Sequence, residues 1–177
     1  WRRHRFSAAQ TMALAQQLYE GLPIGKEGSV GLITYMRTDS TRVARSAIVE
    51  TREFIGGRYG ADFVPPHARS FTRVVKGAQE AHEAIRPTSI QREPELIKSH
   101  LTTNQFRLYD LIWKRMVASQ MAAAIFDSTS VNIEARCQDT KTAYLLRCSS
   151  SVMRFPGFTA LYTEAKDEAD EEKRPSL

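Results

Sequence analysis

The apolar residues of this chain change their spacing once, and this change limits the fold more than any other feature of the sequence. Up to about residue 121 most of them recur at the spacing of helices that bury one face. Over residues 126–135 and 142–148 they alternate with polar residues, as they do in strands. The sequence therefore predicts a mainly α fold with some β (α+β), in which helices come first and antiparallel strands follow.

The first expected helix begins at Ser7 and Gln10, which have the spacing of a capping box. Gly21 and Pro23 are expected to end it, because neither residue continues a helix well. The apolar residues at helical spacing between these limits are Met12, Ala15, Leu18 and Tyr19. A glycine-rich connection then leads to a short strand over residues 31–35.

A second helix is expected over residues 40–55, stopped by the glycine pair at 56–57. Its expected buried stripe consists of Val43, Ala47, Ile48, Thr51, Phe54 and Ile55. After an irregular loop, a short helix is expected over residues 78–85. It must end before Pro87, because the residue preceding a proline avoids helical angles.

The longest helix is expected over residues 103–121, with Thr102 and Gln105 as its capping box. Its aromatic and apolar stripe comprises Phe106, Tyr109, Trp113, Met116 and Val117. Aromatic residues can also stack on bases, but their helical spacing favours core packing here.

The later part of the chain is expected to form strands over residues 126–135, 142–148 and 152–162, the last with a turn at Pro156 and Gly157. Thr129, Val131 and Ile133 are expected to share one face. The tail from residue 163 is acidic and polar, which is typical of disorder.

Charge is distributed unevenly along the chain. The net charge is +5, and residues 1–94 hold 14 Lys and Arg against 9 Asp and Glu, whereas residues 95–177 hold 11 of each. A basic first half suggests a polyanionic partner, and it favours a nucleic acid over a membrane surface as that partner.

No apolar run reaches the roughly 18 residues of a membrane span. Cys137 and Cys148 lack metal-site or redox spacing and are expected to be buried or half-buried thiols, although a disulfide stays open.

The segment over residues 31–41, GLITYMRTDST, carries the most chemistry. A strand would place Tyr35 and Arg37 on one face, and a helix starting directly afterwards would offer unpaired N–H groups to an anion. An unperturbed tyrosine has a pKa of about 10 and is a weak nucleophile near neutral pH. Arg37 can favour the phenolate and bind phosphate oxygens. Asp39 either orients Arg37 or caps the helix, and Tyr35 itself can be read as a half-buried core residue.

This segment resembles the active-site segment of type IA DNA topoisomerases. Two more segments resemble that family in the same order: FSAAQTMALAQQLYEG at residues 6–21 and QEAHEAIRPT at residues 79–88. The resemblance continues through residues 108–121 and 126–129, and it covers residues 6–160 as a whole. It implies that this chain includes the active-site tyrosine domain of such an enzyme.

The resemblance implies that Tyr35 bonds to the 5′-phosphate of a cut DNA strand and that Arg37 contacts the scissile phosphate. It also implies DNA-binding or active-site support by a second group of residues: Thr38, Asp39, Ser40, His82 and Arg86. Read locally, His82 can be a structural histidine, and Arg86 can pair with Glu83 or face solvent. His82 and Arg86 would share a face of the short helix.

The family resemblance implies three parts: a helical, winged-helix-like tyrosine domain at 1–122, strands of an arch at 123–162, and the acidic tail at 163–177. The family also uses Mg²⁺, bound by a toprim domain. No carboxylate cluster of that kind is found here, so that domain, with the rest of the arch, is expected outside this chain. The chain alone is then expected to bind no metal and to be inactive, within a cytoplasmic, nucleoid-associated bacterial enzyme or an organellar one.

Three other interpretations stay open. A nucleic-acid-binding module without catalysis would share the basic first half, and a structural fragment would keep Tyr35 in its core. A tyrosine recombinase would use the same kind of nucleophile, but it needs an Arg and His order that this sequence lacks.

Overall fold

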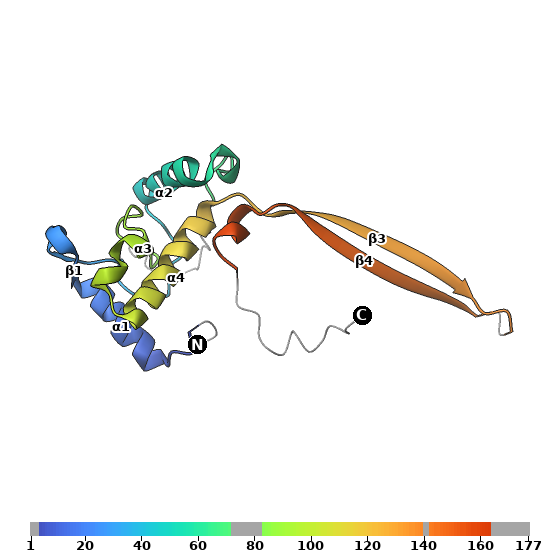
Figure 1. The fold of residues 1–177 in the computed structure, drawn as a ribbon, viewed down its shortest axis with the longest axis horizontal. Coiled ribbons are helices and arrows are strands. Elements are labelled where there is room, and N and C mark those ends of the chain that lie inside the picture. The colour runs from blue at the N-terminus through green and yellow to red at the C-terminus, as the bar shows by residue number, and fades with distance from the viewer. Residues whose placement is uncertain (1–3, 72–82, 140–141, 164–177) are drawn as a thin grey trace.

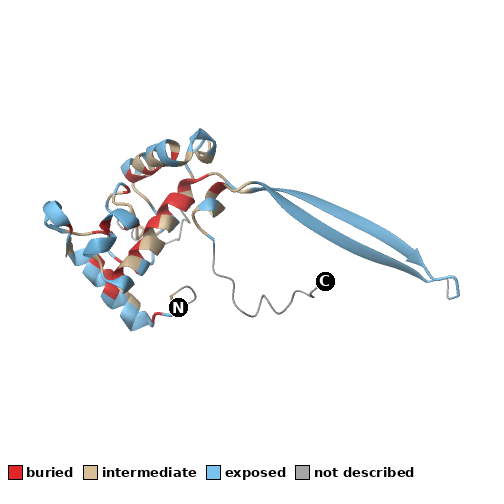
Figure 2. Cartoon of the chain, in the orientation of Figure 1, coloured by how far each residue is buried: buried red, intermediate tan, exposed pale blue. Residues whose placement is uncertain are grey.

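A helical body and a long β-hairpin make up the chain, and the hairpin projects away from the body (Figure 1). The computed structural model describes residues 4–71, 83–139 and 142–163. Helices and antiparallel strands both occur among them, so the α+β expectation is confirmed. Buried residues lie in the body, whereas the hairpin is exposed along its length (Figure 2). No helix in the described part of the chain is both long and apolar enough to cross a membrane.

Helices α1 (Ala8–Glu20) and α4 (Thr103–Gln120) pack against each other in the body. The Ser7 hydroxyl accepts a hydrogen bond from the Gln10 N–H, and Thr102 and Gln105 form a complete capping box, as predicted. Buried side chains of these helices include Leu14, Ala15, Leu18, Tyr109, Trp113, Met116 and Val117. The stripe predicted for α4 is therefore largely confirmed, although Phe106 is only half-buried.

The stripe predicted for α1 is partly wrong. Met12 and Tyr19 are exposed, and Leu14 faces the core in their place. Leu14, Ala15 and Leu18 form the face of α1 that packs in the core, and Met12 and Tyr19 lie outside that face.

Helix α2 runs from Arg45 to Tyr59, so both predicted limits were wrong. It starts five residues later than expected, and it continues through Gly56 and Gly57 to Tyr59, with Gly60 at φ 102° as its C-cap. Glycine lowers helix propensity by only about 1 kcal/mol, which packing offsets. The buried residues of α2 are Ala47, Thr51 and Ile55, all members of the predicted stripe.

The segment predicted as a strand at residues 31–35 is extended, but its only ladder contact in the described residues is a single antiparallel bridge between Ile33 and Pro87. Most of the short helix predicted at 78–85 lies outside the described residues. Its last part, residues 83–85, is not helical. Short elements also include β1 (Leu22–Pro23) paired with β2 (Ser29–Val30), and α3 (Pro94–Ile97).

The hairpin consists of β3 (Ile125–Arg136) and β4 (Ala143–Phe155), which pair antiparallel with one irregularity at Ile125 and Phe126. The strand predicted at 126–135 is confirmed. The strand predicted at 142–148 and the start of the one predicted at 152–162 belong to one strand, because β4 runs without a break to Phe155. The rest of the predicted third strand was wrong, since the 3₁₀ helix η4 (Gly157–Ala160) follows Pro156.

The two faces of the hairpin differ near its middle, where one carries apolar pairs and the other carries serine pairs. The register places Val131 opposite Cys148 and Ile133 opposite Leu146 on one face. On the other face two serine pairs join their hydroxyls, Ser128 with Ser151 and Ser130 with Ser149. Thr129, Val131 and Ile133 share a face as predicted, but that face is exposed. Cys137 and Cys148 are both exposed, so their predicted burial was wrong.

The root of the hairpin is tightly joined to the body. The Ala122 N–H donates to the Phe63 carbonyl at 2.8 Å, and the Phe158 N–H donates to the Ala122 carbonyl at 2.9 Å. Gly157 has a φ of 49°, and a Cβ there would lie 2.4 Å from the Ala123 backbone. Only glycine fits at this position. The acidic tail lies outside the described residues except for Thr163.

Candidate active site

Tyr35 lies two residues after the bridge at Ile33, on a segment without regular secondary structure. Leu32 and Ile33 anchor the segment in the core at 0% and 1% exposure, and Met36 is also buried. Tyr35 is 55% exposed and Arg37 is exposed as well, so the two side chains flank a buried methionine. A half-buried core role for Tyr35 does not fit this exposure. The side chain of Tyr35 is accessible from solvent.

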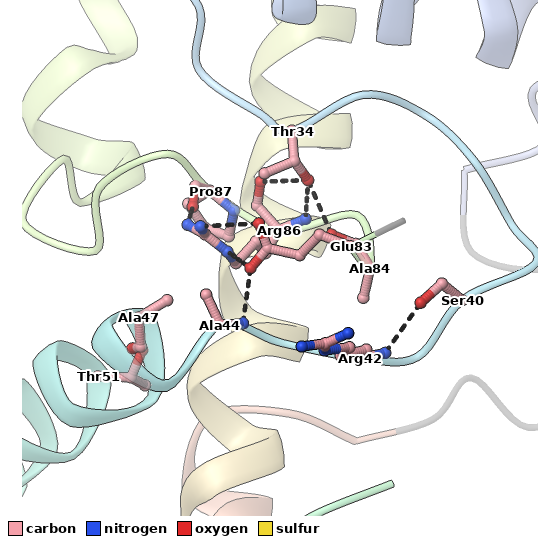
Figure 3. Close-up of polar contacts among 10 residues, drawn as sticks. All are labelled: Thr34, Ser40, Arg42, Ala44, Ala47, Thr51, Glu83, Ala84, Arg86 and Pro87. Carbon is pink, nitrogen blue, oxygen red and sulfur yellow. Dashed lines mark hydrogen bonds and ion pairs between the residues drawn. The ribbon is translucent and has the colours of Figure 1, made fainter. Parts of the chain in front are cut away.

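A second segment, residues 83–88, holds the tyrosine segment in place (Figure 3). The Thr34 N–H donates to the Arg86 carbonyl at 2.9 Å. The Thr34 hydroxyl donates to the Ala84 carbonyl at 2.8 Å and accepts from the Arg86 N–H at 3.0 Å. The Thr88 N–H donates to the Leu32 carbonyl at 3.0 Å. The backbone on the N-terminal side of Tyr35 is therefore fixed by contacts from about fifty residues later in the chain.

Glu83 and Arg86 form a bidentate ion pair, which we call the clamp. The Glu83 carboxylate accepts from Arg86 Nε at 2.7 Å and from Nη2 at 3.1 Å. The same carboxylate accepts from the Ala44 N–H at 2.7 Å, and the Ala84 N–H donates to the Arg42 carbonyl at 2.7 Å. The clamp thus joins residues 83–88, which hold the tyrosine segment, to the residues that precede α2 (Figure 3).

The pKa of Glu83 is lower than its ordinary value. Burial alone would raise it, but hydrogen bonds from Arg86 and the Ala44 N–H, with the charges of Arg86 and Arg42, outweigh burial. The Arg86 side chain is only 14% exposed, and its Nη1 also donates to the Pro87 carbonyl at 2.8 Å. The local alternative for Arg86, a pair with Glu83, is the arrangement found. This geometry favours a positioning role for Arg86.

The polar residues after Tyr35 make local contacts. Arg37 Nε lies 3.5 Å from the Asp39 carboxylate, so Asp39 is placed to orient Arg37. The Ser40 hydroxyl accepts from the Arg42 N–H at 3.2 Å. Neither Asp39 nor Ser40 caps the helix, because α2 begins at Arg45 and its N-cap, Ala44, has no side-chain cap. The expected helix N-terminus directly beside Tyr35 was therefore wrong.

Thr38 is exposed near Arg37, on the same stretch of chain as Tyr35. His82 lies outside the described residues, so its predicted place near the tyrosine stays a prediction. Thr34 and the Ala44 N–H were missed as parts of the site, because nothing in their local sequence indicates partners in residues 83–86. The described residues contain no group of three His, Cys, Asp or Glu side chains that could hold a metal ion, so they do not fit a magnesium site.

Comparison with known proteins gives a consistent result. A family model described as DNA topoisomerase matches residues 1–177. The full-length topoisomerase I from Thermotoga maritima, solved in a monoclinic crystal form, is similar with a TM-score of 0.72 and 35% sequence identity. The similarity covers 94% of this chain but 26% of the Thermotoga chain. The chain therefore spans about a quarter of the length of that relative.

Proposed function

Because this chain belongs to the type IA DNA topoisomerase family, we propose that it supplies the nucleophile of an enzyme that cuts and reseals one DNA strand. The observation that carries the proposal is Tyr35, an exposed tyrosine on a segment whose backbone is fixed on its N-terminal side. A rigidly held segment suits a nucleophile that must meet a phosphorus atom in line.

In the proposed reaction the Tyr35 oxygen attacks the phosphorus of a DNA phosphodiester. The phenol proton leaves to solvent or a base, the bond between phosphorus and the 3′-oxygen breaks, and that oxygen takes up a proton. The 5′-phosphate is then bonded to Tyr35. The reverse attack by the 3′-hydroxyl reseals the strand and releases the phenol. Between these steps the second strand or duplex passes, which relaxes supercoils.

Arg37 is proposed to contact the scissile phosphate, since a guanidinium matches phosphate oxygens in shape and charge. Asp39 orients Arg37 through their ion pair. Thr38, Ser40 and His82 are proposed to contact single-stranded DNA around the tyrosine. Arg86 supports the site by positioning the tyrosine segment, because its guanidinium is already bonded to Glu83 and to the Pro87 carbonyl.

The remaining parts of the enzyme are proposed to lie outside these 177 residues. The family is generally Mg²⁺-dependent, and we assign the magnesium ligands to a separate toprim domain. Residues 1–122 would form the winged-helix-like tyrosine domain, and the hairpin would be part of an arch. The face of the hairpin that carries Val131, Ile133 and Leu146 would pack against other strands of that arch. A bacterial enzyme of this kind would act on nucleoid DNA in the cytoplasm.

Covalent trapping tests the proposal. The gene product that contains this chain is incubated with Mg²⁺ and a single-stranded oligonucleotide labelled at its 3′ end, and the reaction is quenched in detergent. We expect label on the wild-type protein and on Tyr144→Phe, a control that changes another exposed tyrosine, but none on Tyr35→Phe. Equal label on all three proteins would exclude Tyr35 as the nucleophile. No label on any of them although DNA binds would favour a binding module without catalysis.

The 177-residue chain by itself gives a second test. We expect it to show no Mg²⁺-dependent relaxation of supercoiled DNA, because the proposed carboxylates are elsewhere. Robust relaxation by the isolated chain would contradict that assignment.

A further inference from the structure

Two exposed tyrosine rings touch beside the proposed site. The rings of Tyr19 and Tyr35 meet edge to face, with their centroids 5.2 Å apart and their planes at 70°. Tyr19 is 40% exposed and Tyr35 is 55% exposed, so this contact lies at the surface rather than in the core. Tyr19 therefore contributes its ring to a surface contact with Tyr35 and not to the core.

The backbone beneath the two rings is locked together. The Leu32 N–H donates to the Leu18 carbonyl at 2.7 Å, and both leucine side chains are fully buried. A Cβ at Gly31 would lie 2.7 Å from the Tyr19 carbonyl oxygen, so only glycine permits this approach. The end of α1 is therefore fixed against the segment that carries Tyr35. Tyr19 projects from a rigid support, and its ring meets the Tyr35 ring at a defined place.

Fixing the backbone does not fix the Tyr35 side chain, which still rotates about two bonds. An exposed phenol with no neighbour would sample several rotamers, most of which point its oxygen away from a bound phosphate. Misplacing a reacting atom by about 1 Å can cost on the order of a hundredfold in rate. Edge-to-face contact is a preferred geometry of aromatic pairs, so the Tyr19 ring selects among these rotamers.

We propose that Tyr19 is a positioning residue for Tyr35: its ring holds the Tyr35 phenol in an orientation suited to attack on the phosphate. This inference rests on the proposed nucleophilic role of Tyr35. Tyr19 acts through its ring rather than its hydroxyl, because the contact is made between the two rings. The role predicts a loss in the cleavage step while DNA affinity stays the same.

The test is single-turnover cleavage of a saturating single-stranded oligonucleotide by the gene product that contains this chain, with the dissociation constant and unfolding temperature measured in parallel. We expect Tyr19→Ala to slow cleavage by about threefold to tenfold. Tyr19→Phe should restore the wild-type rate because it keeps the ring. Met12→Ala changes another exposed side chain of α1 and should leave the rate unchanged.

Three results would overturn the inference: a wild-type rate in Tyr19→Ala, an equally slow rate in Tyr19→Phe, or a loss that appears only as weaker DNA binding. The last result would make the Tyr19 ring a base-stacking platform instead. Alanine favours helices and Tyr19 is exposed, so folding of the Ala variant is expected. If the wild type forms no adduct at Tyr35, the proposed function fails first, and the two failures are thus distinguishable.

Discussion

Replacing Glu83 by glutamine removes one charge from the clamp while it keeps the shape of the side chain. The Glu83 carboxylate accepts from Arg86 Nε at 2.7 Å, from Arg86 Nη2 at 3.1 Å and from the Ala44 N–H at 2.7 Å. A glutamine has one terminal oxygen and one terminal amide nitrogen. At least one of the three donors would then face another donor. We expect Glu83→Gln to lower the free energy of unfolding.

The size of this loss follows from the burial of the pair. A hydrogen bond to a charged group contributes about 1.5–3 kcal/mol, and removing one partner of a fully buried ion pair costs about 3–5 kcal/mol. The Arg86 side chain is 14% exposed but that of Glu83 is 30% exposed, so water screens part of the interaction. We expect a loss of about 2 kcal/mol, which lowers the unfolding temperature by about 4–8 °C for a chain of this size.

Urea unfolding, followed by the fluorescence of the buried Trp113, measures the effect. Glu95→Gln is the matched control, because Glu95 also pairs with a residue three positions later, Lys98 at 3.0 Å, but is 71% exposed. We expect the control to change stability by less than about 0.5 kcal/mol. Equal losses in the two variants would refute the conclusion that the clamp stabilises the fold.

The same variant predicts a pH dependence. The pKa of Glu83 is lower in the folded chain than its ordinary value of 4.5, so the folded state binds this proton less readily than the unfolded state. The stability from Glu83 is therefore complete above the unfolded pKa, and it is lost as pH falls through the folded pKa. The difference between wild type and Glu83→Gln should be full at neutral pH and should narrow below about pH 4.5. A difference that stays constant down to pH 3 would contradict this assignment.

Two further predictions concern packing and exposure. Gly31→Ala should destabilise the chain by about 1–3 kcal/mol, because the added Cβ would meet the Tyr19 carbonyl oxygen. Gly57→Ala should stabilise the chain by roughly 0.5–1 kcal/mol, because a Cβ at this position of α2 meets open space. Urea unfolding compares the two variants, and equal effects would contradict the close approach at Gly31. Cys137 and Cys148 should both react with a chromogenic thiol reagent without denaturant, because both are exposed. Protection of either thiol would contradict its exposed place on the hairpin.

Local patterns predicted the parts of the fold that local interactions decide. The capping box of Thr102 and Gln105 and the stripe through Trp113 are set within one helix, so spacing alone predicted α4. The first strand of the hairpin was predicted for the same reason. Gly56 and Gly57 misled the prediction, because the burial of Ile55 outweighs the low helix propensity of two glycines.

The candidate site depends on contacts between distant residues, and these have no local signal. The Ala44 N–H is satisfied by Glu83 from across the site. Such pairings are decided by the tertiary fold, so the sequence could suggest Tyr35 and Arg37 but not the segment that holds them.

In the described part of the chain the hairpin joins the body at its root, near Ala122 and Gly157, and its strands beyond the root are exposed. The length of the hairpin is therefore independent of the packing of the core. One residue added to each strand would move every later side chain to the opposite face, whereas two would keep both faces. Two residues in each strand advance the tip by about 7 Å, and no buried residue of the body has to change. The reach of this chain can therefore be altered in steps of two residue pairs without repacking its core.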